Sequence, residues 1–114
     1  MIAKGLRKAV LVRDGYRCHY CDEKLYPHDR DSTIDHKVPK CLGGTDAFEN
    51  LLASCSRCNF AKGDMSYQLF LSIWRESLER GGNIKTVEAV CAVWKQRSTY
   101  KPATQWNAVL AGCC

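Results

Sequence analysis

Two Cys-x-x-Cys pairs constrain this chain more than any other feature of its sequence. Cys18 and Cys21 form the first pair, and Cys55 and Cys58 form the second. Two intervening residues let both sulfurs of one tight turn point at one ion, and Zn²⁺ accepts four thiolates in a tetrahedron. The sequence therefore predicts a four-cysteine zinc site that joins two segments separated by 33 residues. Because four thiolates leave no open coordination position, we expect this zinc to be structural.

Length, charge and cysteine usage bound the class of protein. A chain of 114 residues suits one domain, or a small core with an extension. A secreted disulfide framework would be expected to follow a signal peptide, and the N-terminus has no apolar segment of that kind. No apolar run approaches the length that spans a bilayer, so we expect a cytoplasmic protein without a membrane partner. The net charge of +5 suits an anionic partner, but it suits a solvated surface equally well.

The segment between and after the cysteine pairs predicts a hairpin followed by a helix. Pro39 ends a short alternating stretch, and Gly43-Gly44 indicates a loop. Gly63 follows a short helical stretch at the position where glycine commonly ends a helix. A strand, a loop, an antiparallel strand and a helix are thus expected in this order, at residues 33–38, 41–47, 48–53 and 56–62.

Helical periodicity flanks this central segment on both sides. Residues 2–14 place apolar side chains on one face of a helix, and residues 66–80 do the same. Thr86 is the expected N-cap of a further helix. The aromatic side chains of these helices are more probable in the core than stacked on bases. We therefore expect an α+β protein, with a zinc-stapled core over residues 1–64 and a helical extension over residues 65–114.

Asp35, His36 and Asn59 are the candidate site residues. Neighbouring side chains on a strand point to opposite faces, so Asp35 and His36 should serve a site in different ways. If the 56–62 helix packs across the hairpin, Asp35 and Asn59 supply two oxygen ligands to one cation. Oxygen ligands with open positions suit Mg²⁺ or Mn²⁺, whereas the thiolates suit zinc.

The run DHKVPKCLGGTDAFENL, followed by CSRCNFAKG, resembles the motif of the HNH endonuclease family. The resemblance covers roughly residues 13–63 and is to the cysteine-flanked ββα-metal (His-Me finger) form. It implies that His36 is the general base that activates water and that Asp35 is a metal ligand. It also implies that Asn50 braces the loop between the strands. Asn59 stands where the final histidine of the motif would stand, which makes this chain an HNN variant.

The resemblance implies hydrolysis of DNA phosphodiester bonds. A divalent metal on Asp35 and Asn59 would stabilise the phosphate and the leaving 3′ oxygen, and the products would carry 5′-phosphate and 3′-hydroxyl groups. Candidate phosphate contacts are Lys62, Arg57 and Lys37, although surface charge is an equal alternative for Lys62 and Arg57. We expect binding through phosphate contacts with little sequence specificity.

Two other functions fit parts of the same pattern. A non-catalytic, zinc-stapled nucleic-acid-binding module would keep the cysteines and the basic charge, but it would need neither His36 nor the oxygen ligands. A purely structural zinc domain would dock on a protein partner, or on a second copy, through the C-terminal helices. The joint presence of Asp35, His36 and Asn59 favours the nuclease. The short chain and stand-alone motif suggest a phage origin, which would place the protein in the host cytoplasm.

Overall fold

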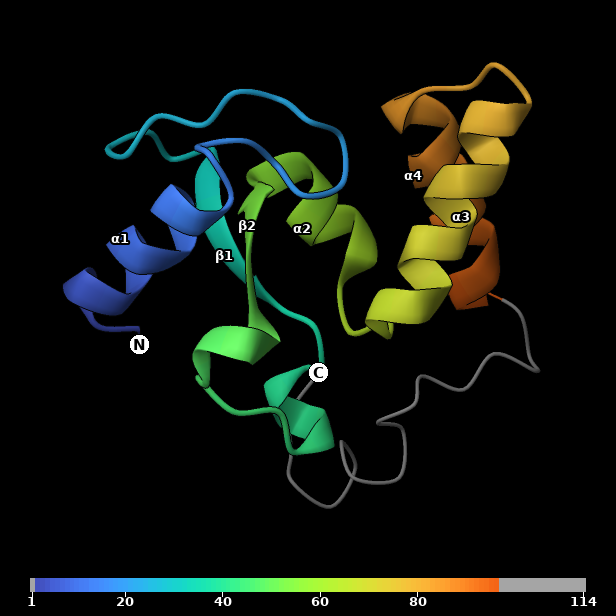
Figure 1. Ribbon diagram of the computed structural model, residues 1–114. Coiled ribbons are helices and arrows are strands. Elements are labelled where there is room, and N and C mark those ends of the chain that lie inside the picture. The colour runs from blue at the N-terminus through green and yellow to red at the C-terminus, as the bar shows by residue number, and fades with distance from the viewer. Residues whose placement is uncertain (1, 97–114) are drawn as a thin grey trace.

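Two antiparallel strands with a helix on either side form the centre of the structure (Figure 1). The structure is a computed structural model that describes residues 2–96. Its helices are α1 (Lys4–Arg13), α2 (Ser56–Lys62), α3 (Tyr67–Glu79) and α4 (Ile84–Gln96). Its strands are β1 (Ser32–His36) and β2 (Leu51–Cys55), and two short 3₁₀ helices are η1 (Lys40–Leu42) and η2 (Phe48–Asn50). The expected α+β class, with an N-terminal helix and a C-terminal helical extension, is confirmed.

The hairpin has a buried strand and a half-buried strand. β1 pairs with β2 from Ser32 opposite Cys55 to His36 opposite Leu51. Every residue of β2 is buried, because α1 contacts β2 and α2 contacts both strands. On β1 only Ser32 and Asp35 are buried, so the rest of this strand stays accessible.

The observed strand boundaries differ from the expected ones. Residues 48–50, expected to begin the second strand, form η2 instead, and β2 runs on to Cys55. The first strand ends at His36, because the Val38 backbone N–H donates to the side chain of Asn50 instead of to a strand partner. Gly63 ends α2 as expected, with φ at 56°, a conformation that favours glycine.

α4 begins three residues earlier than expected. Thr86 is not the N-cap; Asn83 precedes the helix and its Oδ1 accepts a hydrogen bond from Lys85 N over 2.9 Å. Thr86 Oγ1 accepts in return from Asn83 N over 3.3 Å. The two side chains therefore satisfy two backbone donors at the start of α4, those of Lys85 and Asn83.

α3 and α4 share one core with the hairpin and the cysteine turn. Phe70 and Trp74 of α3 and Cys91 of α4 are buried in the same cluster as Tyr20 and Leu52. The aromatic side chains of α3 that the periodicity predicts to be core therefore lie there. The domain division at residue 64 remains a prediction, and residues 97–114 of the expected extension lie outside the described part. Within residues 2–96, no helix has the length and apolar character needed to cross a membrane.

Candidate metal centre and active site

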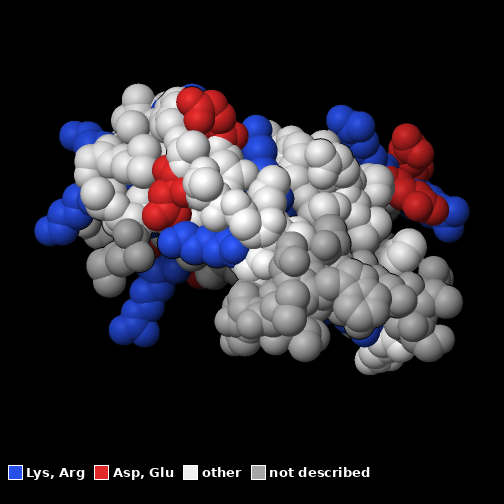
Figure 2. Space-filling view, turned by 90° about the horizontal axis from the view of Figure 1, so that it is seen from below, with Lys and Arg blue, Asp and Glu red and all other residues white. Residues whose placement is uncertain are grey.

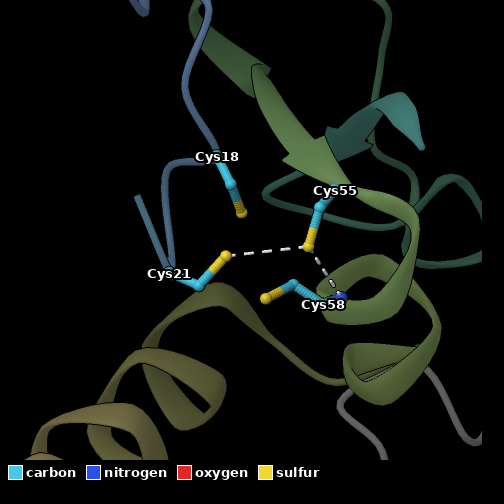
Figure 3. Close-up of side chains that lie close together, drawn as sticks. All are labelled: Cys18, Cys21, Cys55 and Cys58. Atoms are coloured by element: carbon cyan, nitrogen blue, oxygen red, sulfur yellow. Dashed lines mark hydrogen bonds between the residues drawn. The ribbon is translucent and has the colours of Figure 1, made fainter. Parts of the chain in front are cut away.

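The two Cys-x-x-Cys pairs meet as the sequence predicts. The sulfur atoms of Cys18, Cys21, Cys55 and Cys58 all lie within 4.8 Å of one another (Figure 3). The turn after α1 supplies two of them, and the junction of β2 with α2 supplies the other two. Cys21 Sγ lies 3.7 Å from Cys55 Sγ. Because Zn–S bonds of about 2.3 Å place tetrahedral sulfurs roughly 3.8 Å apart, the cluster fits zinc.

The electrostatics of the cluster also favour a bound cation. The hydrogen bonds to Cys18 are the largest cause that raises the pKa of both Cys21 and Cys58. Thiolates this close cannot all ionise without a compensating positive charge. A divalent ion at the centre would supply that charge and hold all four as thiolates. Cys55 has a second role, since its sulfur accepts from Cys58 N over 3.4 Å and caps α2.

The predicted site residues of β1 and α2 line one hollow in the surface. Asp35 and His36 come from β1, and Asn59 and Lys62 come from α2, which packs across the hairpin. The hollow measures about 400 Å³, enough for a hydrated cation and a phosphate group. The other lining residues are Ile34, Pro39, Lys40, Cys41, Gly63 and Asp64.

Asp35 lies at the buried side of this hollow, with 4% of its surface exposed. Tyr20 donates a hydrogen bond to Asp35 Oδ2 over 2.6 Å. Lys62 Nζ lies 3.4 Å from Asp35 Oδ1. Burial, followed by the nearby Asp35 carboxylate, raises the pKa of Tyr20 far above its ordinary value, so the hydroxyl remains a donor. Tyr20 lies between the first two cysteines, and sequence spacing offers no signal for this contact.

Lys62 is a buried cation and not a surface charge. Its side chain is fully buried, and Nζ donates to the backbone oxygen of His36 over 3.0 Å. Burial lowers the pKa of Lys62, and the Asp35 carboxylate opposes that effect. Lys62 therefore holds the end of β1 and the Asp35 carboxylate from one side. The surface-charge alternative for this residue is wrong, because α2 turns this side chain inward, one turn after Asn59.

Asn59 has an amide whose orientation is set by a neighbour. Its Nδ2 donates to Thr33 Oγ1 over 3.0 Å, and Thr33 Oγ1 donates to Ser54 O over 2.7 Å. Among residues 2–96, Oδ1 of Asn59 has no hydrogen-bond partner. This oxygen is thus available as a cation ligand, and Thr33 is a positioning residue that sequence reasoning missed.

His36 is oriented by a carboxylate from the loop before η2. Its Nε2 lies 2.8 Å from Asp46 Oδ1, which is also 3.3 Å from Lys40 Nζ. The hydrogen bond from His36 is the largest cause that lowers the pKa of Asp46, so this carboxylate stays ionised near neutral pH. With Nε2 engaged as the donor, Nδ1 is the ring nitrogen left to accept a proton. The loop was expected, but nothing in its spacing indicated Asp46 as a partner.

Asn50 holds the loop between the strands by backbone hydrogen bonds. Its Oδ1 accepts from Val38 N, and its Nδ2 donates to Val38 O and to Thr45 O over 3.1 and 2.8 Å. Asn50 is absent from the residues that line the hollow. Its place is therefore that of a positioning residue, which ties the end of β1 to the start of β2.

Arg57 and Lys37, the other candidate phosphate contacts, do not line the hollow. Arg57 lies about 200° around α2 from Asn59, on the opposite face. Its guanidinium pairs with Glu88 of α4 through contacts of 2.8 and 2.7 Å. Lys37 follows His36 directly, and its Nζ lies 5.5 Å from the centre of the Tyr67 ring. The structure thus gives Arg57 a partner in α4 and leaves Lys37 near the beginning of α3.

Comparison with known proteins agrees with this geometry. Residues 18–65 match the family model described as HNH endonuclease. The chain is also 33% identical over 85 residues to the CRISPR-associated endonuclease Cas9 of Corynebacterium diphtheriae. That match covers 74% of this chain but only 7% of that much longer protein. The segment of residues 18–65, with its hairpin, helix and clustered cysteines, is thus similar to HNH endonucleases.

Proposed function

We propose that this protein is a metal-dependent endonuclease that hydrolyses phosphodiester bonds of DNA. One observation carries the proposal: Asp35, His36 and Asn59 line a single hollow although they come from two different elements. A general base and two oxygen ligands in one hollow are the groups that hydrolysis of a phosphodiester needs. A non-catalytic zinc module would need none of the three.

Asp35 and Asn59 are the residues that would hold the catalytic cation. A carboxylate and an amide oxygen suit a hard cation such as Mg²⁺ or Mn²⁺, and they leave positions for water and a phosphate oxygen. When bound, the cation supplies positive charge that stabilises the phosphate and the departing 3′ oxygen. Thr33 fixes the orientation of the Asn59 amide by accepting a hydrogen bond from its Nδ2. Lys62 and Tyr20 fix the Asp35 carboxylate from two sides.

His36 is the proposed general base. A water molecule gives a proton to Nδ1 as its oxygen attacks the phosphorus, and the bond from phosphorus to the 3′ oxygen breaks. The leaving oxygen takes a proton from solvent, which yields a 5′-phosphate and a 3′-hydroxyl. Asp46 accepts the Nε2 hydrogen and so fixes the ring and leaves Nδ1 to take the proton. The ionised Asp46 also stabilises the imidazolium that forms.

Phosphate contacts would hold the DNA. Lys37, which follows His36 directly, is the remaining candidate for such a contact. Lys62 is fully buried, so it holds Asp35 and the end of β1 from within and does not contact the DNA. On the face in Figure 2, lysine and arginine side chains are interspersed with acidic ones and do not merge into one basic patch. Affinity that comes from separate phosphate contacts carries little sequence information and falls as salt rises. We assign Arg57 to the contact between α2 and α4 and not to the DNA.

The test is cleavage of supercoiled plasmid by the zinc-loaded protein with Mg²⁺, with Mn²⁺ and with EDTA. We expect cleavage that requires the added metal and that falls by about 10²–10⁴-fold in His36→Ala. His28→Ala is the matched control, because His28 is exposed and does not line the hollow, and it should cut like the wild type. Nicked product would indicate one site acting alone, and linear product would indicate a dimer or two visits.

If the wild type and His36→Ala were equally inert on plasmid, linear duplex and single strands, the nuclease proposal would fail. Retarded DNA on a gel under those conditions would support the non-catalytic binding module instead. Cleavage that persists in His36→Ala would place the base elsewhere.

A further inference from the structure

Phe60 is the most exposed large apolar side chain among residues 2–96. It lies on α2 directly after Asn59, and 87% of its surface is exposed. The next most exposed in this group is Leu78, at 57%. Isolated apolar side chains are common on protein surfaces and need no explanation by themselves. The relevant feature of Phe60 is therefore its position, directly after the candidate ligand Asn59.

A shallow second hollow beside Phe60 adjoins the candidate active site. The residues that line it are Thr33, Ser56, Asn59, Phe60, Gly63 and Lys95. Asn59 and Gly63 line the hollow of Asp35 and His36 as well. A strand whose phosphate lies beside Asp35 must continue over an adjoining surface, and the side of α2 that carries Phe60 is one such surface.

The chemistry of this second hollow suits a nucleotide. Its lining consists of hydroxyl, amide and ammonium groups around one aromatic ring, and it contains no carboxylate. Lys95 Nζ is held in place by a 2.8 Å hydrogen bond to Ala61 O, so a fixed positive charge borders the same hollow as the ring. An exposed aromatic ring beside a fixed cation is the arrangement on which unpaired bases stack.

We propose that Phe60 stacks on a base of the nucleotide next to the scissile phosphate. This inference rests on the proposed function. It adds a substrate class, namely DNA whose base is unpaired or easily unstacked at that position, such as a single strand or a distorted duplex. Stacking on an aromatic side chain contributes to affinity without reading the sequence, in agreement with phosphate-based binding. Removal of the ring should weaken binding by about 5- to 100-fold.

The experiment uses the full zinc-loaded chain with His36→Ala, which prevents cleavage during the measurement. Binding of single-stranded and duplex oligonucleotides is followed by fluorescence anisotropy, with 2-aminopurine placed at successive positions. The variants compared in this background are Phe60→Ala, Phe60→Trp and, as the control, Val93→Ala. Val93 is an exposed side chain of α4 that lines neither hollow. The unfolding temperature of each variant is measured in parallel.

We expect Phe60→Ala to lose affinity, most for single strands, and Phe60→Trp to restore it. Val93→Ala should bind within about twofold of its parent, and 2-aminopurine should be quenched at one position only when the ring is present. Equal affinity of Phe60→Ala and its parent would overturn this inference and leave the proposed function intact. A large fall in the unfolding temperature of Phe60→Ala would overturn it too, since the ring would then be packed against protein. No DNA binding by any variant would overturn both.

Discussion

The hydroxyl of Tyr20 donates a 2.6 Å hydrogen bond to Asp35 Oδ2 and so joins the cysteine cluster to the candidate active site. Tyr20 lies between Cys18 and Cys21, and its ring packs edge-on against Phe70 with centroids 4.8 Å apart. A metal on the cysteines would therefore stabilise the chain and also set the position of the carboxylate that is proposed to bind the catalytic cation.

Tyr20→Phe should destabilise the protein by about 1.5–3 kcal/mol, because it removes a donor from a buried carboxylate and keeps the ring packing. The measurement is denaturant unfolding of the zinc-loaded protein. Tyr67→Phe is the control, since its hydroxyl meets His19 Nε2 at an exposed contact of 2.8 Å and should contribute less. Equal effects of the two substitutions would mean that the bond to Asp35 adds nothing beyond an exposed contact.

Lys62→Met should cost about 3–5 kcal/mol of unfolding free energy, because it leaves the buried Asp35 charge without its cation. Adding Asp35→Asn should recover part of the loss, since the uncompensated charge is then gone. Unfolding of the wild type, the two single variants and the double variant completes the cycle. Strictly additive effects would show that Lys62 and Asp35 are not coupled.

The chain should bind one zinc ion, measured by elemental analysis of the purified protein. Cys58→Ser, or a strong chelator, should remove the metal and abolish cooperative unfolding, because in a core this small the metal contributes much of the stability. Cys91→Ala is the matched control, since Cys91 is also buried but lies outside the cluster. Full zinc content in Cys58→Ser would contradict the four-thiolate site.

Asp46→Asn should lower the cleavage rate by about tenfold or more, yet by less than His36→Ala, because it disturbs the orientation of the base and does not remove it. The hydrogen bond from His36 lowers the pKa of Asp46, so the contact is fully present above the ordinary carboxyl pKa and is lost as the pH falls through the lowered pKa. Rates are therefore compared at pH 8. Asp22→Asn, at an exposed pair with Arg17, should leave the rate unchanged. An unchanged rate in Asp46→Asn would remove Asp46 from the site.

Cys91 should resist alkylation in the folded protein. Burial raises its pKa to about 11, so only about one thiol in 10³ is ionised at pH 8, and the side chain is 2% exposed. Iodoacetamide at pH 8, followed by mass spectrometry of the Cys91 peptide, should show labelling only after unfolding in guanidinium chloride. The native rate should rise with pH as the thiolate forms. Rapid native labelling at pH 8 would show that α4 opens readily.

Local patterns in the sequence predict the elements of the site well. The two Cys-x-x-Cys pairs meet in one cluster, and Asp35 and Asn59 line one hollow, as their places on a strand and a helix predict. The expected element boundaries are wrong where side chains compete for backbone hydrogen bonds. Residues 48–50 leave the strand where the Asn50 side chain takes the backbone groups of the loop, and Asn83 replaces Thr86 as the helix cap.

The sequence by itself determined which residue types stand at the candidate metal-ligand and base positions, because those depend on spacing along one turn, strand or helix. Only the tertiary structure decided their partners. Tyr20 reaches Asp35, Asp46 reaches His36 and Lys62 turns inward, because packing of α2 and the loops on the hairpin brings them together. Such contacts depend on the relative placement of whole elements, and the free energy that selects it is spread over the core. The sequence spacing between two such residues therefore does not predict their contact.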